Sequence, residues 1–352
     1  MHSALILTIA HWVSIAVVAL VLFLMVYILF LRTLLLLKER RVRDFTMLWS
    51  PILLSGKSDK LDHFPHISYI DRYSFLILWN KLREEKDKDV NIRDWMNSIA
   101  IATGIDRVAR RLLEKRSIRK RLLAVVILGQ LRDKSQWDKL CQMAVSDHAL
   151  LSLAAAQAIA RIDHEAAAPI LVPLVVRRID WPAAKVASIL GEISSDLVSK
   201  PLADAIMGAP NDEMQRLIPY LETCPDAVAL PVVRRILNDP PDDKVIGPCL
   251  YVIGKFRDEK DLKLVRQYLA HPRWHVRAHA AACLGKIGTK KDEEKLVALL
   301  TDPEWWVRYR AAQAIVDLSS SSMDRIDKIK KDLDDRYARD ILDQVMAERR
   351  ST

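Results

Sequence analysis

Glycine, aromatic residues and cysteine are all scarce in this chain. Its 352 residues include only nine glycines, and 7% are aromatic, which argues against an all-β protein because strands favour aromatic side chains and tight turns favour glycine. The four cysteines lie far apart, with no CxxC spacing. The sequence therefore offers neither a zinc-finger pattern nor a disulfide framework, and reduced thiols in a cytosolic compartment are the simplest interpretation.

Motifs of common catalytic and nucleotide-binding sites are missing as well. The chain has no GxSxG, no P-loop and no GxGxxG, and no cysteine has a histidine partner at a recognisable spacing. His271, His275 and His279 are spaced by four, and such a spacing can ligate zinc. No acidic residue accompanies them, so a solvated surface is the preferred interpretation. We predict no enzyme activity, no cofactor, no metal and no small-molecule substrate.

One long apolar segment lies at the N-terminus. Trp12 to Leu31 is a run of twenty residues without a charge, long enough to cross a hydrocarbon core of about 30 Å. Apolar residues continue on both sides, so we place the span at about 11–37, within an anchor of residues 1–43. A buried core helix is one alternative, but the segment is apolar on every face. A cleaved signal peptide is the other, but the first ten residues contain no lysine or arginine.

Basic residues follow the apolar segment directly and indicate its orientation. They are Lys38, Arg40, Arg41 and Arg43, with Arg32 close by. Since loops rich in lysine and arginine stay in the cytoplasm, this side is predicted to be cytoplasmic. We expect a single-pass protein of the bacterial inner membrane, with its N-terminus outside and the rest of the chain inside.

A repeated phrase marks the second half of the chain. HPRWHVRAHAAACLGKIG, residues 271–288, recurs 31 residues later as DPEWWVRYRAAQAIVDL, residues 302–318. An apolar anchor near the end of a helical stretch recurs at spacings of 31 or 32 residues, at Leu128, Ile159, Leu190, Leu221, Ile253, Leu284 and Ile315. A period this regular predicts an α-solenoid, in which stacked helical pairs bury a continuous core.

The phrase resembles the short HEAT-like repeats of about 30 residues that phycobilin lyases also contain. The residues that carry the resemblance are Pro272, Val276, Arg277, Ala280, Ala281, Leu284 and Gly285, with their counterparts from Pro303 to Val316. The resemblance implies a HEAT-like α-solenoid of about seven helical-pair repeats. With the apolar N-terminal segment as one transmembrane helix, the expected fold is all-α. The resemblance also implies that Arg277 and Arg308 each pair with an acid of a neighbouring repeat. Nothing in the chain resembles a chromophore site.

Two further segments flank the predicted solenoid, which we place at residues 93–320. Residues 44–92 are expected to form a juxtamembrane loop, extended around 49–65, followed by a helix over 72–85. Residues 321–352 are expected to form one long polar helix with a narrow apolar stripe. That helix either caps the last repeat or pairs with a partner helix.

One cluster of basic residues exceeds an ordinary solvated face. Within residues 107–121 only Glu114 offsets eight positive side chains: Arg107, Arg110, Arg111, Lys115, Arg116, Arg119, Lys120 and Arg121. Anionic lipid headgroups or an acidic protein partner would suit the cluster. Nucleic acid is a weaker alternative because no aromatic residues are interleaved. The net charge of +9 also favours an anionic neighbour.

These features predict a membrane-anchored cytoplasmic scaffold or adaptor that binds a membrane or membrane-associated protein. Its layout resembles that of accessory subunits of envelope machinery, such as systems for polysaccharide synthesis and secretion. The alternative is a basic surface that binds anionic lipid headgroups or nucleic acid. An enzyme would instead need a polar pocket with perturbed titratable groups.

Overall fold

The computed structural model describes residues 2–56, 64–86, 88–240, 242–318 and 323–350, and all regular secondary structure in these ranges is helical. These ranges contain no strand. The chain divides into two compact units, Met1–Gln136 and Trp137–Thr352. The all-α fold class predicted from the sequence is confirmed.

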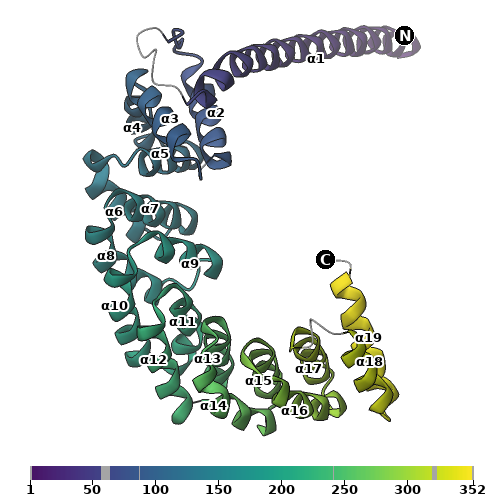
Figure 1. Cartoon of the computed structure of the whole chain (residues 1–352). Helices are drawn as coiled ribbons and strands as arrows, with labels where there is room; N and C mark the ends of the chain where they lie inside the picture. Colours follow the sequence, from purple (N-terminus) through teal and green to yellow (C-terminus); the bar gives the residue numbers. More distant parts are fainter. Residues whose placement is uncertain (1, 57–63, 87, 241, 319–322, 351–352) are drawn as a thin grey trace. The chain divides into compact units, whose positions relative to one another are not determined.

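The described helices of the first unit are α1 (His2–Leu54), α2 (Arg72–Glu85), α3 (Val90–Ala102), α4 (Ile105–Leu113) and α5 (Ile118–Gln130), followed by a 3-10 turn over Lys134–Gln136 (Figure 1). Helix α2 spans the residues expected from the sequence. Helix α1, however, continues to Leu54, so the expectation of an extended chain from residue 49 is wrong for its first residues.

Tertiary packing explains why α1 continues through Pro51. Phe45, Trp49 and Leu53 recur every four residues and therefore share one face of the helix. Trp49 and Leu53 are fully buried, and the Trp49 ring meets the Phe75 ring of α2 edge-on at 4.9 Å between centroids. From α3, Trp95 Nε1 donates a hydrogen bond of 2.8 Å to the Ile52 carbonyl. The last turns of α1 are thus a core element of the first unit.

The N-terminal part of α1 is different, because its apolar side chains have no protein around them. From Leu20 to Leu37 every side chain is exposed. This helix is long and apolar enough to cross a membrane, and none of its apolar window is buried within the structure. Helix α1 is therefore a candidate membrane span. A signal sequence near the N-terminus meets the same criterion of length and apolar composition.

The second unit is a stack of helices. Those described are α6 (Trp137–Val145), α7 (Ala149–Ile162), α8 (His164–Arg177), α9 (Ala183–Glu192), α10 (Ser195–Gly208), α11 (Asn211–Leu217), α12 (Asp226–Asn238), α13 (Asp243–Phe256), α14 (Leu262–Gln267), α15 (Trp274–Ile287), α16 (Glu293–Ala298), α17 (Trp305–Leu318), α18 (Met323–Asp332) and α19 (Arg336–Arg350). Short 3-10 turns complete several of them, at Ile218–Thr223, Glu259–Asp261, Tyr268–Ala270, Lys290–Asp292 and Leu299–Thr301.

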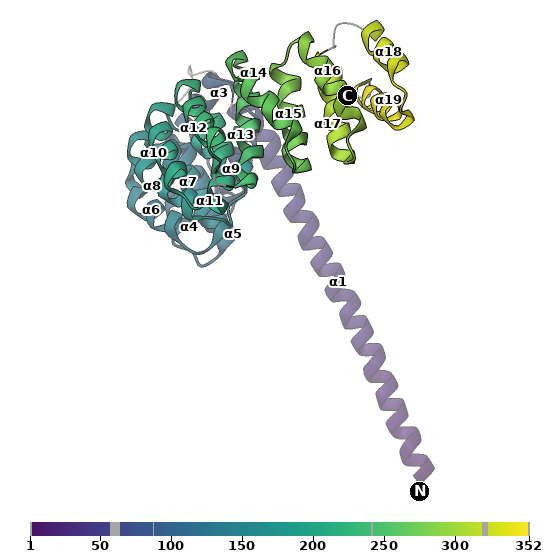
Figure 2. The same ribbon diagram turned by 90° about the horizontal axis from the view of Figure 1, so that it is seen from below.

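These helices form two layers, as expected for a solenoid. One layer runs through α7, α9, the 3-10 turn Ile218–Thr223, α13, α15 and α17, and the other through α8, α10 and α12 to α14 and α16 (Figures 1 and 2). Six of the seven periodic anchors lie in the first layer and the seventh, Leu128, lies in α5; each is at most 2% exposed. The period of the sequence therefore identifies the residues that form the core of the stack.

Small residues set the spacing within the layer. Val276, Ala280 and Leu284 of α15 are fully buried. A Cβ atom on Gly285 would lie 2.7 Å from the Cα of Ala314 on α17, so glycine is needed where the two helices touch. Close contact between successive helices is how a repeat too small to bury its own apolar face gains a core.

The C-terminal segment differs from its prediction. The single long helix expected there is two helices, α18 and α19, separated by Leu333–Asp335. Helix α19 packs on α17 and buries Ala338, Ile341, Leu342, Val345 and Met346. Tyr309 on α17 also donates a hydrogen bond of 2.7 Å to Glu348. These contacts are those of a helix that covers the end of the stack.

Candidate functional site

The predicted basic cluster lies on α4, on the first turn of α5 and on the turn that joins them. Arg110 forms ion pairs within the first unit. Its Nε donates a hydrogen bond of 2.6 Å to Asp133, and its Nη2 lies 3.2 Å from the Asp106 carboxylate. Burial raises the pKa of the Asp133 carboxyl, but hydrogen bonds from Ser135 and Arg110 outweigh it, so this pKa lies below its ordinary value. Arg121 is half-buried, with its Nε out of contact with solvent.

Six members of the cluster remain on the surface: Arg107, Arg111, Lys115, Arg116, Arg119 and Lys120. Arg119 and Lys120 lie in the first turn of α5, whose Ser117 N-cap makes no side-chain hydrogen bond. Cations at a helix N-terminus are unfavourable, because the unpaired backbone N–H groups there already carry partial positive charge. The stability of α5 therefore does not account for these side chains, and together they form an anion-attracting surface.

Pairs of arginine and aspartate tie the repeats of the second unit together. Arg277 donates from Nε and Nη2 to the two carboxylate oxygens of Asp302 at 2.7 and 2.8 Å, which confirms the pairing expected for this arginine. Arg266 binds Asp292 in the same bidentate way. Each of these pairs links one repeat to the next: Asp302 lies just before α17 and Asp292 just before α16. Bidentate geometry makes the pairs strong.

Arg308 does not follow this pattern, so the pairing expected for it is wrong. Its Nη1 donates to the backbone carbonyls of Asp302 and Pro303, and its buried Nε has no partner within the described residues. The physical reason is visible in the sequence. Thirty-one residues after Asp302 the chain has Leu333, so the acid that the next repeat would supply is missing.

An exposed aromatic edge lies where α15 and α17 begin. It consists of Trp274, Trp305, Trp306 and Tyr309, and the three tryptophans are 41%, 41% and 52% exposed. Trp305 stacks on Tyr309 with 5.0 Å between ring centroids and meets Trp306 edge-on at 4.8 Å. Exposed, mutually braced indoles lose little freedom when they are covered, which is why tryptophan is enriched in binding hot spots.

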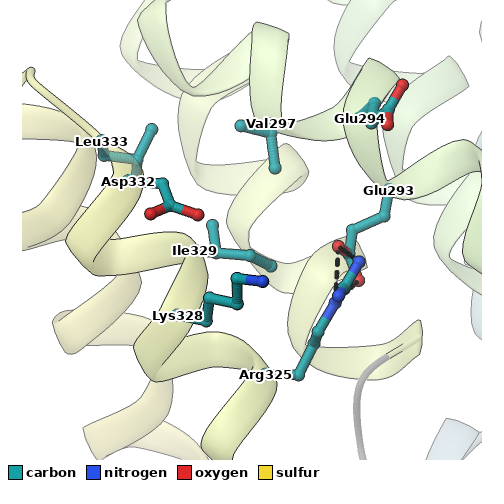
Figure 3. A pocket seen from close by; sticks show the side chains of 8 residues that line it. All are labelled: Glu293, Glu294, Val297, Arg325, Lys328, Ile329, Asp332 and Leu333. Carbon is teal, nitrogen blue, oxygen red and sulfur yellow. Dashed lines mark hydrogen bonds and ion pairs between the residues drawn. The ribbon is translucent and has the colours of Figure 1, made fainter.

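A pocket of about 310 Å³ lies between α16 and α18 (Figure 3). Val297, Ile329 and Leu333 supply its apolar wall, and Arg325 spans it to reach both carboxylate oxygens of Glu293 at 2.7 to 3.2 Å. Lys328 and Asp332 also line it. The ionic groups are paired or of opposite sign, so the pocket joins α16 to α18 and does not gather one charge for a ligand.

Burial shifts the pKa values of one histidine and two thiols of the second unit. Burial lowers the pKa of His279, with help from Arg310 and His275, so its imidazole is neutral near pH 7. Burial raises the pKa of the Cys283 thiol to about 12, and that of Cys249 rises as well. Within the described ranges, no three histidine, cysteine or acidic side chains come together as a metal site.

Comparison with known proteins identifies the repeats. Residues 230–316 match the family model of HEAT repeats. These residues, which run from α12 to α17, are therefore HEAT-like repeats, and repeats of this kind form protein-interaction domains. A search of curated proteins gives no match.

Several solved structures resemble the chain at low similarity. An engineered protein is 15% identical with a TM-score of 0.34, and the alignment covers 88% of this chain and 94% of that one. The complex of CpcE and CpcF of phycocyanin lyase from Nostoc is 16% identical with a TM-score of 0.34, covering 68% and 94%. YibA of Escherichia coli is 16% identical with a TM-score of 0.32, covering 81% and 99%. No function is inferred from likenesses at this level.

Sequence reasoning recognised Trp274 and Trp305 as parts of the repeat but not as members of a surface. The available signal was the doubled tryptophan at 305–306, where the preceding copy has Trp274 and His275. Two adjacent indoles at the start of a helix cannot both face the core, because neighbouring residues point about 100° apart. At least one of them had to be exposed.

Proposed function

We propose that this protein is a membrane-anchored scaffold whose repeat domain binds a protein partner on the cytoplasmic side of a bacterial inner membrane. In this proposal α1 spans the bilayer with its N-terminus outside, and the chain serves as an accessory subunit of an envelope complex, such as one for polysaccharide synthesis or secretion. The HEAT-like repeats support binding, and the layout of anchor followed by repeats supports the location.

One observation carries the proposal: α1 is a single helix with two environments. Its residues from Leu20 to Leu37 are exposed and, apart from Arg32 and Thr33, apolar, which is costly in water and favourable in lipid. Trp49 and Leu53 of the same helix are buried in the core of the first unit. No flexible linker separates the two parts, so the first unit is held at a defined height and orientation relative to the span.

The aromatic edge is the surface that we assign to the protein partner. Covering Trp305 and Trp306 would remove two large apolar side chains from water, and tryptophan hot spots of this kind cost at least about 2 kcal/mol when truncated. We therefore expect Trp306→Ser in the full-length protein to reduce partner binding by roughly 30-fold. The measurement is purification in mild detergent from the native host, with the co-eluting proteins identified and quantified by mass spectrometry.

A matched control for this experiment is Tyr337→Ser, which removes an aromatic ring that is 73% exposed in the same unit. This variant should retain the partner at the wild-type ratio. Loss of the partner in both variants would assign the contact elsewhere. If no membrane protein accompanies the wild type, even after crosslinking in cells, the scaffold function is rejected.

The six surface members of the basic cluster favour a second function, binding of anionic lipid headgroups. Each basic residue near an anionic surface contributes about 1 kcal/mol, so Arg111→Ser, Arg116→Ser and Arg119→Ser together should weaken binding roughly a hundredfold. Native mass spectrometry of the detergent-solubilised protein should show wild type retaining more phosphatidylglycerol than phosphatidylcholine, and the variant losing that preference.

The control is a triple variant of equal charge change, Lys290→Ser, Lys291→Ser and Lys295→Ser, at exposed lysines of the second unit. It should keep the preference for phosphatidylglycerol. If both triple variants behave as wild type, the cluster does not bind lipid. Salt-dependent binding of a single-stranded oligonucleotide, lost in the cluster variant alone, would assign the cluster to nucleic acid instead.

A further inference from the structure

A turn in the first unit displays two large apolar side chains. Tyr69 and Ile70, just before α2, are 80% and 68% exposed, more than any other large apolar side chain described in that unit. The neighbouring Ile67 is buried, so one end of the turn is anchored in the core of the unit. Two adjacent apolar side chains at the tip of a turn present apolar surface to water, and contact with an apolar medium outside the unit would remove it.

The turn is fixed against α1. Asp71 accepts hydrogen bonds from Arg41 Nε at 2.8 Å and Nη2 at 2.9 Å, and its backbone N–H donates to the Ser68 carbonyl at 2.9 Å. The Arg72 guanidinium lies 5.7 Å from the centre of the Tyr69 ring. A bidentate ion pair and a cation–π contact thus hold the tip beside a known position of the candidate membrane span.

That position is the level at which the hydrocarbon of a bilayer would end. Leu34 to Leu37 are the last residues of the exposed apolar run, and Lys38 follows. Arg41 lies four residues beyond Leu37, about 6 Å along the helix axis. Each headgroup layer is about 5–7 Å thick, the difference between a core of about 30 Å and a total of about 40–45 Å shared between two leaflets. The Asp71–Arg41 pair therefore sits at headgroup depth.

We propose that the Tyr69–Ile70 tip inserts into the interfacial layer of the same bilayer that α1 spans. Tyrosine favours this layer because its ring is apolar and its hydroxyl stays hydrated, while Ile70 reaches toward the acyl chains. Arg40, Arg43 and Arg72 supply positive charge at the same level for lipid phosphates. The ligand is the lipid surface itself, and the tip is a second attachment point that prevents the first unit from rotating about α1.

This inference rests on α1 being a membrane span, and the experiment separates the two. Full-length protein carrying Cys141→Ser, with its other cysteines buried, receives single new cysteines labelled with an environment-sensitive fluorophore and is reconstituted into phosphatidylglycerol-containing nanodiscs. Lipids with a spin label near the headgroup serve as the quencher. The label positions are Ile70→Cys at the tip, Met25→Cys in the span and Val90→Cys as the control.

Val90 is a matched control because it is an apolar residue, 53% exposed, in the same unit. It lies near the C-terminal end of α1, which is the end farther from the candidate span. It begins α3, where Ile92 lies beside Gly56, past the end of α1. That point is about 25 Å beyond Leu37 along the helix. The lipid-borne quencher should not reach it.

We expect quenching at Ile70 at least about twofold stronger than at Val90, as for a side chain in the interface. Equal quenching at Ile70 and Val90, with Met25 quenched by lipids labelled deep in the acyl chain, overturns the insertion of the tip and leaves the span intact. If Met25 is not quenched by those lipids, the span itself is rejected, and the insertion with it. Tyr69→Cys repeats the test in case the label at Ile70 disturbs the turn.

Discussion

Replacing Trp49 by alanine is expected to destabilise the first unit by about 3–5 kcal/mol, the cost typical of deleting a large buried aromatic side chain. Trp49 is fully buried, and its ring contacts those of Phe45, Phe64 and Phe75. These contacts join α1 to the rest of the unit. Because a domain is stable by only about 5–15 kcal/mol, the loss is a large share of the total.

Hydrogen exchange of the full-length protein in detergent micelles measures this effect. Amides of α2 and α3 should lose roughly two to three orders of magnitude of protection, since each 1.4 kcal/mol is a factor of ten. Leu48→Ala, one position away on the exposed face of α1, should change protection by less than about 0.5 kcal/mol. Unchanged protection in the Trp49 variant would show that α1 is not part of the core.

Replacing Asp302 by alanine is expected to cost the second unit about 3 kcal/mol. Its side chain is 6% exposed and that of its partner Arg277 is 13% exposed, so the substitution leaves a charge without its counterion inside the stack. Breaking a buried pair from one side costs about 3–5 kcal/mol, and the low end applies here because Arg277 keeps its bonds to the His271 and Pro272 carbonyls.

Asp317→Ala is the matched control, because Asp317 also pairs with an arginine, Arg349, but with both side chains about half exposed. Exposed pairs contribute about 0–1 kcal/mol, so this variant should unfold close to wild type. Thermal unfolding of the full-length protein in detergent checks both. Equal unfolding temperatures for the two variants would show that the Arg277–Asp302 pair does not stabilise the array.

Acid should remove the same contribution. Burial raises the pKa of the Asp302 carboxyl, but hydrogen bonds from Arg277 and from the Glu304 backbone N–H lower it by more, so this pKa lies below that of the unfolded chain. The stabilisation is therefore complete above about pH 5 and is lost as the pH falls through the folded pKa. As the pH is lowered from 5, the unfolding temperature of the wild type should therefore fall by more than that of the Asp302→Ala variant.

The sequence alone determined the parts of this protein that depend on local pattern. The 31-residue spacing of Ile253, Leu284 and Ile315 identified core positions, since a periodic apolar residue in stacked helices can only be buried between neighbours. The uncharged run from Trp12 marked the candidate span, because hydrophobicity over twenty residues needs no tertiary context. That Arg277 pairs with an acid of a neighbouring repeat was implied by the resemblance to HEAT-like repeats, which did not identify the acid as Asp302.

Tertiary structure decided where local signals conflict or where exposure matters. Pro51 predicts the end of a helix, yet α1 continues through it because Trp49 and Leu53 are buried in the core of the first unit. Arg110 and Arg119 look alike in the sequence, but only folding brings Asp133 to the first and leaves the second on the surface. Whether a side chain is buried, paired or exposed depends on residues distant along the chain, and only the packed fold determines which of them meet.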